Sequence, residues 1–529
     1  MKQILTASIF LIISLNCFSQ SDLLITNARI LDGTGNSWFW GSVEVKSGII
    51  KAIHKGKGEV NNVAASKIID AKGLILAPGF IDVHAHIESG IFERPTADNY
   101  IYDGVTTVVT GNCGNSFDDI GEFFRKIDSM KTSINIATLA GHNTIRRLGM
   151  GLANKLATPD DLTKMGALMT KAMQDGAVGM SSGLIYLPGM YSNTEEVIFL
   201  ARVASSYGGV YSTHMRNEGL KVTEAIDEAI NIGKQANIPV QISHFKVSGR
   251  ANWGKSQTTL GMVKQARLDG YDVTIDQYPY TASSTNLATQ VPDWALDGGL
   301  DSLRVKIQNP ATRERIRKEM RDNKEEGKMK SFAFAVVANY PADTFLNGKN
   351  ILEINKMKGR KSNLLNESET ILQMLEKSNA QMVYHTMDEA DVKYIMQYPF
   401  NMPAADGGVS NGKGVPHPRT YGTNARVLGR YVRELKVLTL EEAIRRMTSL
   451  PAQKFNLADR GQIKEGMAAD FVLFDENKIS DMATFEKPHQ FSTGIPYVIV
   501  NGQVTVDNGT HTGLRNGQSL KKKPVTRNP

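Results

Sequence analysis

Two histidines separated by a single residue are the first side chains in this 529-residue chain whose types and spacing could do chemistry. His84 and His86 lie in DVHAH, at the end of an apolar run that is typical of a β-strand. Residues two apart on a strand point to the same side, which for a strand of a closed barrel is the inside. Two imidazoles on one face can chelate a metal ion, although an H-x-H pair alone is weak support for a site.

Further candidate ligands end other apolar segments. They are Cys113 in GNCG, His214 in THMRNEG and His244 in ISHFK. Thiolate and imidazole donors favour zinc over magnesium or calcium, which prefer oxygen ligands. Asp406 ends another segment, PAADGG, where a carboxylate could serve as metal ligand and as general base for a hydrolytic water. The simpler alternative for Asp406 is a chain turn before the two glycines that follow it.

Eight apolar segments alternate with helical stretches, which is the spacing of βα units in a parallel barrel. The carboxyl ends of such strands form the face that carries the active site, and the polar candidates lie at these ends. We therefore predict an α/β protein with a (β/α)8 TIM-like barrel. The predicted strand segments are GFIDVHAH, TTVVTGNCG, INIATLAGH, GAVGMSSG, GVYSTHM, PVQISHF, DVTIDQYPY and FNMPAADGG.

The segments on either side of the barrel read as short strands. Within residues 20–76 and 456–515, Gly and Asn turns separate these strands, which are expected to form one small β-sandwich from both chain ends. The catalytic barrel is predicted over 77–455. A charged, helix-prone stretch at about 295–380 interrupts the alternation of strands and helices between strands seven and eight. It is expected to be an insertion near the barrel mouth. Residues 516–529 form a basic tail.

The N-terminus has the pattern of a secretory signal. A Lys at position 2 precedes an apolar run from Ile4 to Leu15, which is too short to span a bilayer. We expect a signal peptide over 1–19, a mature chain that starts at Gln20, and export to the periplasm or the medium. A lipoprotein anchor at Cys17 fits less well, because Ser14 stands where leucine is usual.

Composition narrows the class of partner. The hydrophobic fraction of 41% and charged fraction of 22% are those of an ordinary soluble globular protein. The net charge of +7 comes partly from the basic tail, and no basic stripe with interleaved aromatics predicts a nucleic-acid partner. We predict no integral membrane span. Without Cys17, the mature chain keeps only Cys113, so it has no internal disulfide.

These motifs resemble the amidohydrolase superfamily and, within it, the D-aminoacylase (N-acyl-D-amino-acid deacylase) family, from about residue 22 to 515. The resemblance is carried by PGFIDVHAH, GVTTVVTGNCG, GAVGMSSGLIYLPGMYS, THMRNEG, ISHFK, DQYPYTASST, HPRTYGTNARVLG and GMAADFVLF. It implies a metal-dependent-hydrolase barrel and zinc-dependent hydrolysis of linear N-acyl-D-amino acids to a carboxylate and a free D-amino acid. The D configuration follows from the resemblance alone.

The resemblance also implies how the ligands divide. Many amidohydrolases bridge two metals with a carboxylated lysine at the end of strand four, but GAVGMSSG has no lysine there. Cys113 would take over the bridging role, as in the D-aminoacylase pattern. The family pattern then implies a tight zinc site at Cys113, His214 and His244, and a weaker second site at His84, His86 and Asp406.

Candidate substrate-binding residues follow the ligands. Lys246 lies two residues after His244 and Arg216 two after His214, so both cations are expected at the barrel mouth, where they could hold a substrate carboxylate. A solvated loop charge is the alternative for each. Three further residues in family-like motifs are expected to contribute to substrate binding: Tyr191, Tyr280 and Ser283.

Three departures from the family pattern leave the substrate side chain open. They are Glu88 after the H-x-H pair, Phe245 after His244 and Asn424 in place of an aromatic. Two other enzyme classes remain alternatives: a cyclic amide hydrolase of the dihydroorotase or hydantoinase kind, and a D-aminoacyl dipeptidase. The cyclic amide hydrolases normally carry the strand-four lysine, which is absent here. A non-enzymatic binding protein is disfavoured, because every candidate ligand is present. The sequence does not indicate the oligomeric state.

Overall fold

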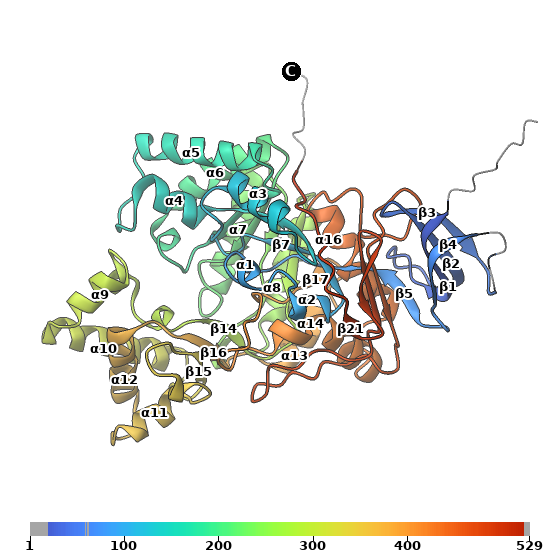
Figure 1. The fold of residues 1–529 in the computed structure, drawn as a ribbon. Coiled ribbons are helices and arrows are strands. Elements are labelled where there is room, and N and C mark those ends of the chain that lie inside the picture. The colour runs from blue at the N-terminus through green and yellow to red at the C-terminus, as the bar shows by residue number, and fades with distance from the viewer. Residues whose placement is uncertain (1–19, 59, 61–62, 523–529) are drawn as a thin grey trace, which may run out of the picture.

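The computed structural model describes residues 20–58, 60 and 63–522 (Figure 1). The predicted signal peptide at 1–19, with Cys17, lies outside the described residues, as does the end of the basic tail from residue 523. Within the described part of the chain, no helix is both long enough and apolar enough to cross a membrane.

Eight parallel strand positions form the barrel in chain order. Two hydrogen-bonded groups, β6-β7-β8 and β9-β10-β11-β12-β13-β17, follow one another, and β8 and β9 are separated only by Leu139. The barrel closes where the backbone N–H of His86 donates to the carbonyl of Gly407, 2.8 Å away, just beyond β6 and β17. The strands are β6 (Phe80–Asp82), β7 (Val105–Thr110), β8 (Asn135–Thr138), β9 (Ala140–Gly141), β10 (Gly179–Gly183), β11 (Val210–His214), β12 (Val240–Ile242), β13 (Val273–Gln277) and β17 (Asn401–Pro403).

Helices between the strands cover the outside of the barrel, as Figure 1 shows for the green and cyan part of the chain. Their starts follow local rules. The Thr158 side chain accepts from the backbone N–H of Asp161, the Asp161 carboxylate accepts from the backbone of Thr158, and Pro159 is the first helical residue. The principal helices are α3 (Ile120–Met130), α5 (Pro159–Gln174), α6 (Thr194–Ser206), α7 (Val222–Ala236), α8 (Ser256–Leu268), α13 (Glu389–Met396) and α15 (Leu440–Met447).

Strands from both chain ends form one nine-stranded sheet. β1 (Ser21–Ile30) pairs with β2 (Phe39–Lys46) on one side and with β4 (Ala65–Asp70) and then β5 (Ile75–Pro78) on the other. β5 in turn pairs with the late strand β18 (Phe471–Phe474), which joins the two ends of the chain. The outer strands are β3 (Ile49–Lys55), β19 (Tyr497–Val500), β20 (Gln503–Asp507) and β21 (Thr510–His511). Apolar side chains from both ends, such as Ile25 and Ile499, pack in one cluster.

The insertion between strands seven and eight is longer than the predicted range of about 295–380. It begins with β14 (Ser283–Asn286), which pairs with β16 (Gln381–Tyr384) at the other end of the excursion, and β16 also pairs with β15 (Ala335–Asn339). The segment SSTN has no alternation of apolar residues that would predict a strand, and it forms one where β16 lies beside it. Four helices complete this lobe, which is visible at the lower left of Figure 1: α9 (Leu300–Lys306), α10 (Pro310–Glu326), α11 (Ile351–Met357) and α12 (Leu364–Lys377).

The lobe has an apolar core of its own. Buried side chains from 287 to 384, among them Phe332, Ile371 and Met382, form a cluster separate from that of the barrel. Polar residues at the base of the lobe are therefore free to face the barrel mouth.

Candidate metal centre and active site

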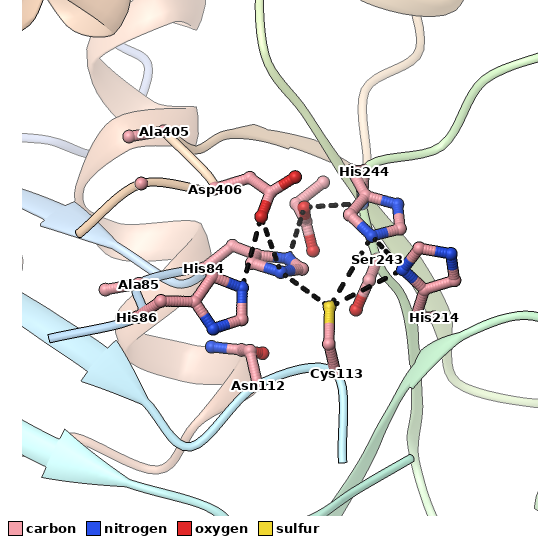
Figure 2. Close-up of polar contacts among 12 residues, drawn as sticks. His84, Ala85, His86, Asn112, Cys113, His214, Ser243, His244, Ala405 and Asp406 are labelled. Atoms are coloured by element: carbon pink, nitrogen blue, oxygen red, sulfur yellow. Dashed lines mark hydrogen bonds and ion pairs between the residues drawn. The ribbon is translucent and has the colours of Figure 1, made fainter. Parts of the chain in front are cut away.

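All six predicted ligands meet at the carboxyl ends of the barrel strands (Figure 2). They form two groups of potential donors that share one thiol. The first is Cys113, His214 and His244, and the second is His84, His86, Cys113 and Asp406. Residues more than 300 positions apart in the chain, such as His84 and Asp406, thus face one point in space, as expected from side chains that end different strands of one barrel.

The first group fits a zinc ion. Cys113 Sγ lies 3.6 Å from His214 Nδ1 and 3.6 Å from His244 Nε2. Ordinary Zn–S and Zn–N bond lengths in a tetrahedral site give a sulfur–nitrogen separation of about 3.6 Å. The two imidazole nitrogens are 2.8 Å apart, closer than the corresponding separation of about 3.3 Å. The donor types and the sulfur–nitrogen distances therefore suit zinc. To bind it, the two imidazole nitrogens would have to move slightly apart.

The second group lies directly beside the first. His84 Nε2 is 3.3 Å from Cys113 Sγ and 3.4 Å from Asp406 Oδ1, and His86 Nε2 is 3.1 Å from the same carboxylate oxygen. The thiol of Cys113 stands between the groups, which is the position that a bridging ligand requires.

Burial decides the protonation states of these donors. Burial lowers the pKa of His214 well below its usual value, so its imidazole is neutral and has a lone pair to offer. Burial raises the pKa of the Cys113 thiol well above its usual value, and the carboxylates Asp406 and Glu218 raise it further. A thiolate at this place would need a strong local positive charge, which a metal ion supplies.

Three of the ligands have left-handed backbone conformations. The φ angles are 51° at Cys113, 35° at His244 and 47° at Asp406, and none of these residues is glycine. Such conformations are uncommon outside glycine and collect at functional sites, where the surrounding structure holds them. Each turns the chain sharply at a strand end and directs the side chain across the barrel mouth.

Two carboxylates behind the histidines fix the ring orientations. Asp276 accepts from the backbone N–H of His244 at 2.7 Å and lies 3.2 Å from His84 Nδ1. Glu218 Oε1 lies 2.9 Å from His244 Nδ1. A carboxylate on one imidazole nitrogen leaves the other nitrogen to face a metal, an arrangement that is usual behind metal-binding histidines.

Asp406 is held from two sides. Its Oδ2 pairs with Nη2 of Arg419 at 2.8 Å, while Oδ1 faces the histidines. Burial opposes ionisation, but the charges of Arg419 and His84 outweigh it, so the pKa of Asp406 lies well below its usual value. Asp406 does lie in a chain turn, as its positive φ shows. Its side chain also points toward the other donors (Figure 2).

A cavity of about 920 Å³ opens over these residues, and we call it the central cavity. His86, Cys113, Asp406 and Arg419 line its floor. Its walls come from the segment after β10, including Leu187 and Met190, and from the base of the inserted lobe. The lobe contributes Ser284, Thr285, Asn286, Ala288, Thr289, Val291, Asp293, Leu296 and Leu300.

Lys246 does not line the central cavity. Its ammonium group is buried beneath His244, donates to Glu218 Oε1 at 2.6 Å and to the His244 carbonyl at 2.8 Å, and lies 2.9 Å from His244 Nδ1. The predicted carboxylate anchor is therefore already paired within the protein. Its position fits a role in orienting Glu218 and His244 better than direct contact with a substrate.

The other predicted substrate residues have varied surroundings. Arg216 lines the central cavity, but Glu228 holds its guanidinium group at 2.9 Å. Ser283 pairs with Tyr384 in the lobe, and its neighbour Ser284 lines the cavity instead. Tyr191 donates to the carbonyl of Asp293 at 3.0 Å, outside the central cavity. Tyr280 is buried against His417 and Arg426.

Sequence reasoning missed the residues that support the donors. Arg419, Asp276 and Glu218 all lie within segments that already pointed to a site, namely HPRTYG, DQYPY and THMRNEG. Glu218 comes four residues after His214 and Arg419 thirteen after Asp406. A charged residue inside such a segment is a usable signal, but its partner is visible only in three dimensions.

Comparisons with known proteins agree with this geometry. Residues 67–330 and 403–506 match a sequence profile described as the amidohydrolase family. The chain is 32% identical to a D-aminoacylase of Alcaligenes xylosoxydans xylosoxydans over 95% of this chain and 98% of that protein. It is 33% identical to an N-acyl-D-glutamate deacylase of the same organism over 91% and 93%.

A solved structure extends the match to three dimensions. The N-acyl-D-glutamate deacylase of Bordetella bronchiseptica, determined with zinc and a phosphonate mimic of the tetrahedral intermediate, superposes with a TM-score of 0.80 at 32% identity. The match covers 95% of this chain and all of that one. The chain belongs to the amidohydrolase family, in the branch of the D-aminoacylases and N-acyl-D-amino-acid deacylases.

Proposed function

We propose that the protein hydrolyses the amide bond of N-acyl-D-amino acids in a zinc-dependent reaction. The observation that carries the proposal is the pair of donor groups that share Cys113, with Asp406 at the floor of a cavity. The D-aminoacylase and the two N-acyl-D-amino-acid deacylases that the chain resembles over more than 90% of its length supply the substrate class and its D configuration.

Zinc would be held tightly by Cys113, His214 and His244, and a second, weaker site would use His84, His86 and Asp406. Zinc supplies Lewis acidity, which polarises an amide carbonyl and makes water acidic enough to lose a proton near neutral pH. Asp276 and Glu218 keep the histidine rings in the orientation that binding needs.

Asp406 is the proton carrier of the reaction. Its carboxylate is ionised at neutral pH and can accept a proton from the water that attacks the amide carbon. The same carboxyl group then gives this proton to the leaving nitrogen, so the C–N bond breaks and the amino acid leaves with a neutral amine. The pairing of Arg419 with Oδ2 fixes the carboxylate, so that Oδ1 faces the reacting groups.

Arg419 is also the better candidate for the substrate's α-carboxylate. It lines the central cavity, is 4% exposed, and its Nη1 has no hydrogen-bond partner among the described residues. A buried donor without a partner costs about 1–3 kcal/mol, and a bound carboxylate would remove that cost. We therefore assign to Arg419 the role that the sequence predicted for Lys246, with Ser284 near it on the cavity wall.

We also propose that the enzyme is exported and that the mature chain starts at Gln20. The support is the sequence pattern of residues 1–19, in which a basic start precedes a short apolar run. N-terminal sequencing of periplasmic or secreted protein would check this, and a cytoplasmic enzyme that retains Met1 would contradict it.

The function is tested on purified protein with its metal content measured. We expect bound zinc, hydrolysis of N-acetyl-D-leucine, little hydrolysis of the L isomer, and loss of activity on chelation that zinc restores. Hydrolysis of hydantoin or dihydroorotate with no action on linear N-acyl substrates would overturn the proposal.

A further inference from the structure

A second pocket adjoins the central cavity, and we call it the distal pocket. It measures about 680 Å³ and lies between the segment after β10 and the inserted lobe. The two hollows share four lining residues, Met190, Thr289, Val291 and Asp293. The distal pocket adds Asn154, Tyr191, Gln290, Pro292, Trp294, Asn323 and Lys324. The two hollows are therefore adjacent at these residues, and a substrate held over the donor groups would extend toward the distal pocket.

The distal pocket offers donors and acceptors whose partners are not supplied by the protein. Gln290 Oε1 is buried and accepts no hydrogen bond from any described residue. Lys324 lies over the rings of Phe332 and Phe334, at 5.5 and 5.6 Å, and no described carboxylate pairs with it. Burial lowers the pKa of Lys324 to about 8, and no nearby anion offsets this effect. Asp293 adds an exposed carboxylate at the junction of the two hollows.

The size of the hollows bears on which part of a substrate reaches the distal pocket. Pockets that bind drug-sized ligands measure about 300–1,000 Å³, so the central cavity alone is larger than an N-acetyl amino acid requires. With the α-carboxylate at Arg419 and the amide at the donor groups, two parts of the substrate extend further. An amino-acid side chain has a fixed maximum length, whereas a peptidyl acyl group can be lengthened by whole residues. The acyl group is therefore the part that can enter the distal pocket.

We propose that the distal pocket binds the far end of a peptide-like acyl group, so that the enzyme removes a C-terminal D-amino acid from a short peptide. This inference rests on the proposed function and names its acyl substrate. Water adds across the last amide bond: the hydroxyl goes to the peptide carbonyl carbon and the hydrogen to the leaving nitrogen. A peptide presents both N–H and C=O groups, which match the carboxylate of Asp293, the amide of Gln290 and the ammonium group of Lys324. A hydrocarbon chain would leave the buried Gln290 oxygen without a partner and would displace water from Lys324 and Asp293 without replacing its hydrogen bonds.

The test compares three substrates that share one D-residue, using the zinc-loaded enzyme. They are N-acetyl-D-leucine, N-acetyl-triglycyl-D-leucine and N-dodecanoyl-D-leucine. We expect kcat/KM to be at least about 10-fold higher for the peptidyl substrate than for the acetyl substrate, because charge-assisted and neutral hydrogen bonds at the distal pocket together exceed about 1.4 kcal/mol.

Variants then locate the effect. Lys324→Met and Gln290→Leu should each reduce kcat/KM for the peptidyl substrate about 3- to 10-fold and leave the acetyl substrate unchanged, consistent with one lost hydrogen bond. Lys318→Met is the matched control, because Lys318 is exposed on the same helix, α10, and does not line the distal pocket. Thermal unfolding of each variant checks that the lobe keeps its fold.

Equal kcat/KM for the acetyl and peptidyl substrates would overturn the inference and leave the proposed function standing. A preference for the dodecanoyl substrate, or equal losses on all substrates in the two variants, would also overturn it. Failure to hydrolyse any of the three would overturn this inference, and failure on N-acetyl-D-glutamate and N-acetyl-D-aspartate as well would overturn the proposed function.

Discussion

Arg419 and Asp406 form a buried ion pair at the floor of the central cavity, with Nη2 2.8 Å from Oδ2. The pair fixes one oxygen of the carboxylate and leaves the other beside His84 and His86. Nη1 of the same guanidinium group is buried and has no hydrogen-bond partner among the described residues. Under the proposed function, one arginine would both orient Asp406 and bind the substrate carboxylate.

Replacement of Arg419 should weaken the recognition of the α-carboxylate. Activity is measured on N-acetyl-D-leucine and on the corresponding carboxamide, which lacks the negative charge. We expect Arg419→Met to lower kcat on both substrates, because Asp406 loses its partner, and to reduce the preference for the acid about 10- to 100-fold further, as one charge-assisted contact is lost.

Lys246→Met is the companion variant, because Lys246 is a buried cation beside the same site that does not line the cavity. It should leave the acid-to-amide preference unchanged. A loss of that preference in Lys246→Met, with none in Arg419→Met, would return the anchoring role to Lys246.

Removal of the shared thiol should remove the tightly bound zinc. Cys113 is buried, so Cys113→Ala deletes a small side chain that the barrel can tolerate, while both donor groups lose a member. We expect zinc content after dialysis to fall to near zero and circular dichroism at low temperature to stay unchanged. Full zinc occupancy in this variant would remove Cys113 from the ligand set.

Neutralisation of Asp406 should separate proton transfer from metal binding. Asp406→Asn keeps the size of the side chain and the zinc at Cys113, His214 and His244, but it removes the group that accepts the proton. We expect kcat to fall by at least about 10²-fold, the lower end of general acid–base contributions. Turnover close to that of the wild type, with zinc retained, would limit Asp406 to its role in the turn.

A stability prediction concerns Lys454, which lies far along the chain from the donor groups. This residue ends α16 (Ser449–Lys454), is 6% exposed, and has its ammonium group 3.1 Å from the carbonyl of Asp272. Burial lowers the pKa of Lys454 to about 8, only partly offset by Asp272. The unfolded chain holds this proton up to a pH of about 10.4. The charge therefore destabilises the fold fully below pH 8, and this cost disappears as the pH rises from about 8 to 10.4.

Lys454→Met should accordingly raise the free energy of unfolding at pH 7 by up to about 3 kcal/mol, less whatever the lost hydrogen bond to Asp272 contributes. The gain should shrink when denaturant unfolding is repeated at pH 9 and pH 10. A gain that does not change with pH would mean that better packing, and not the buried charge, is responsible.

The ligand positions could be predicted because their placement depends on topology. A histidine or cysteine at the carboxyl end of a barrel strand faces the mouth whatever the helices outside the barrel are doing, so strand position alone brings His84 and Cys113 together. The role of Lys246 could not be predicted in the same way. Spacing put it near His244, but only the fold reveals that Glu218 has already paired with it. Arg419 comes from a segment after the last strand, whose path over the mouth has no periodic signal.

The inserted lobe shows a second limit of prediction from sequence. Its charged, helix-prone stretch predicts helices, whereas nothing in the sequence predicts its first strand. Ser283 to Asn286 are partly exposed and carry no apolar alternation, and their strand exists because Tyr384 and its neighbours in β16 supply the hydrogen-bond partners. Pairing between segments about 100 residues apart lies beyond what a local pattern can indicate.

The sheet that joins the two chain ends also affects how the polypeptide is made. β5 completes its pairing only when β18 arrives, almost 400 residues later in synthesis, so a growing chain cannot finish this sheet until its last tenth has emerged. Contacts of such long sequence separation form late and slowly. During that delay this sheet remains incomplete, which is compatible with the export that we propose, because a translocation channel accepts unfolded chain.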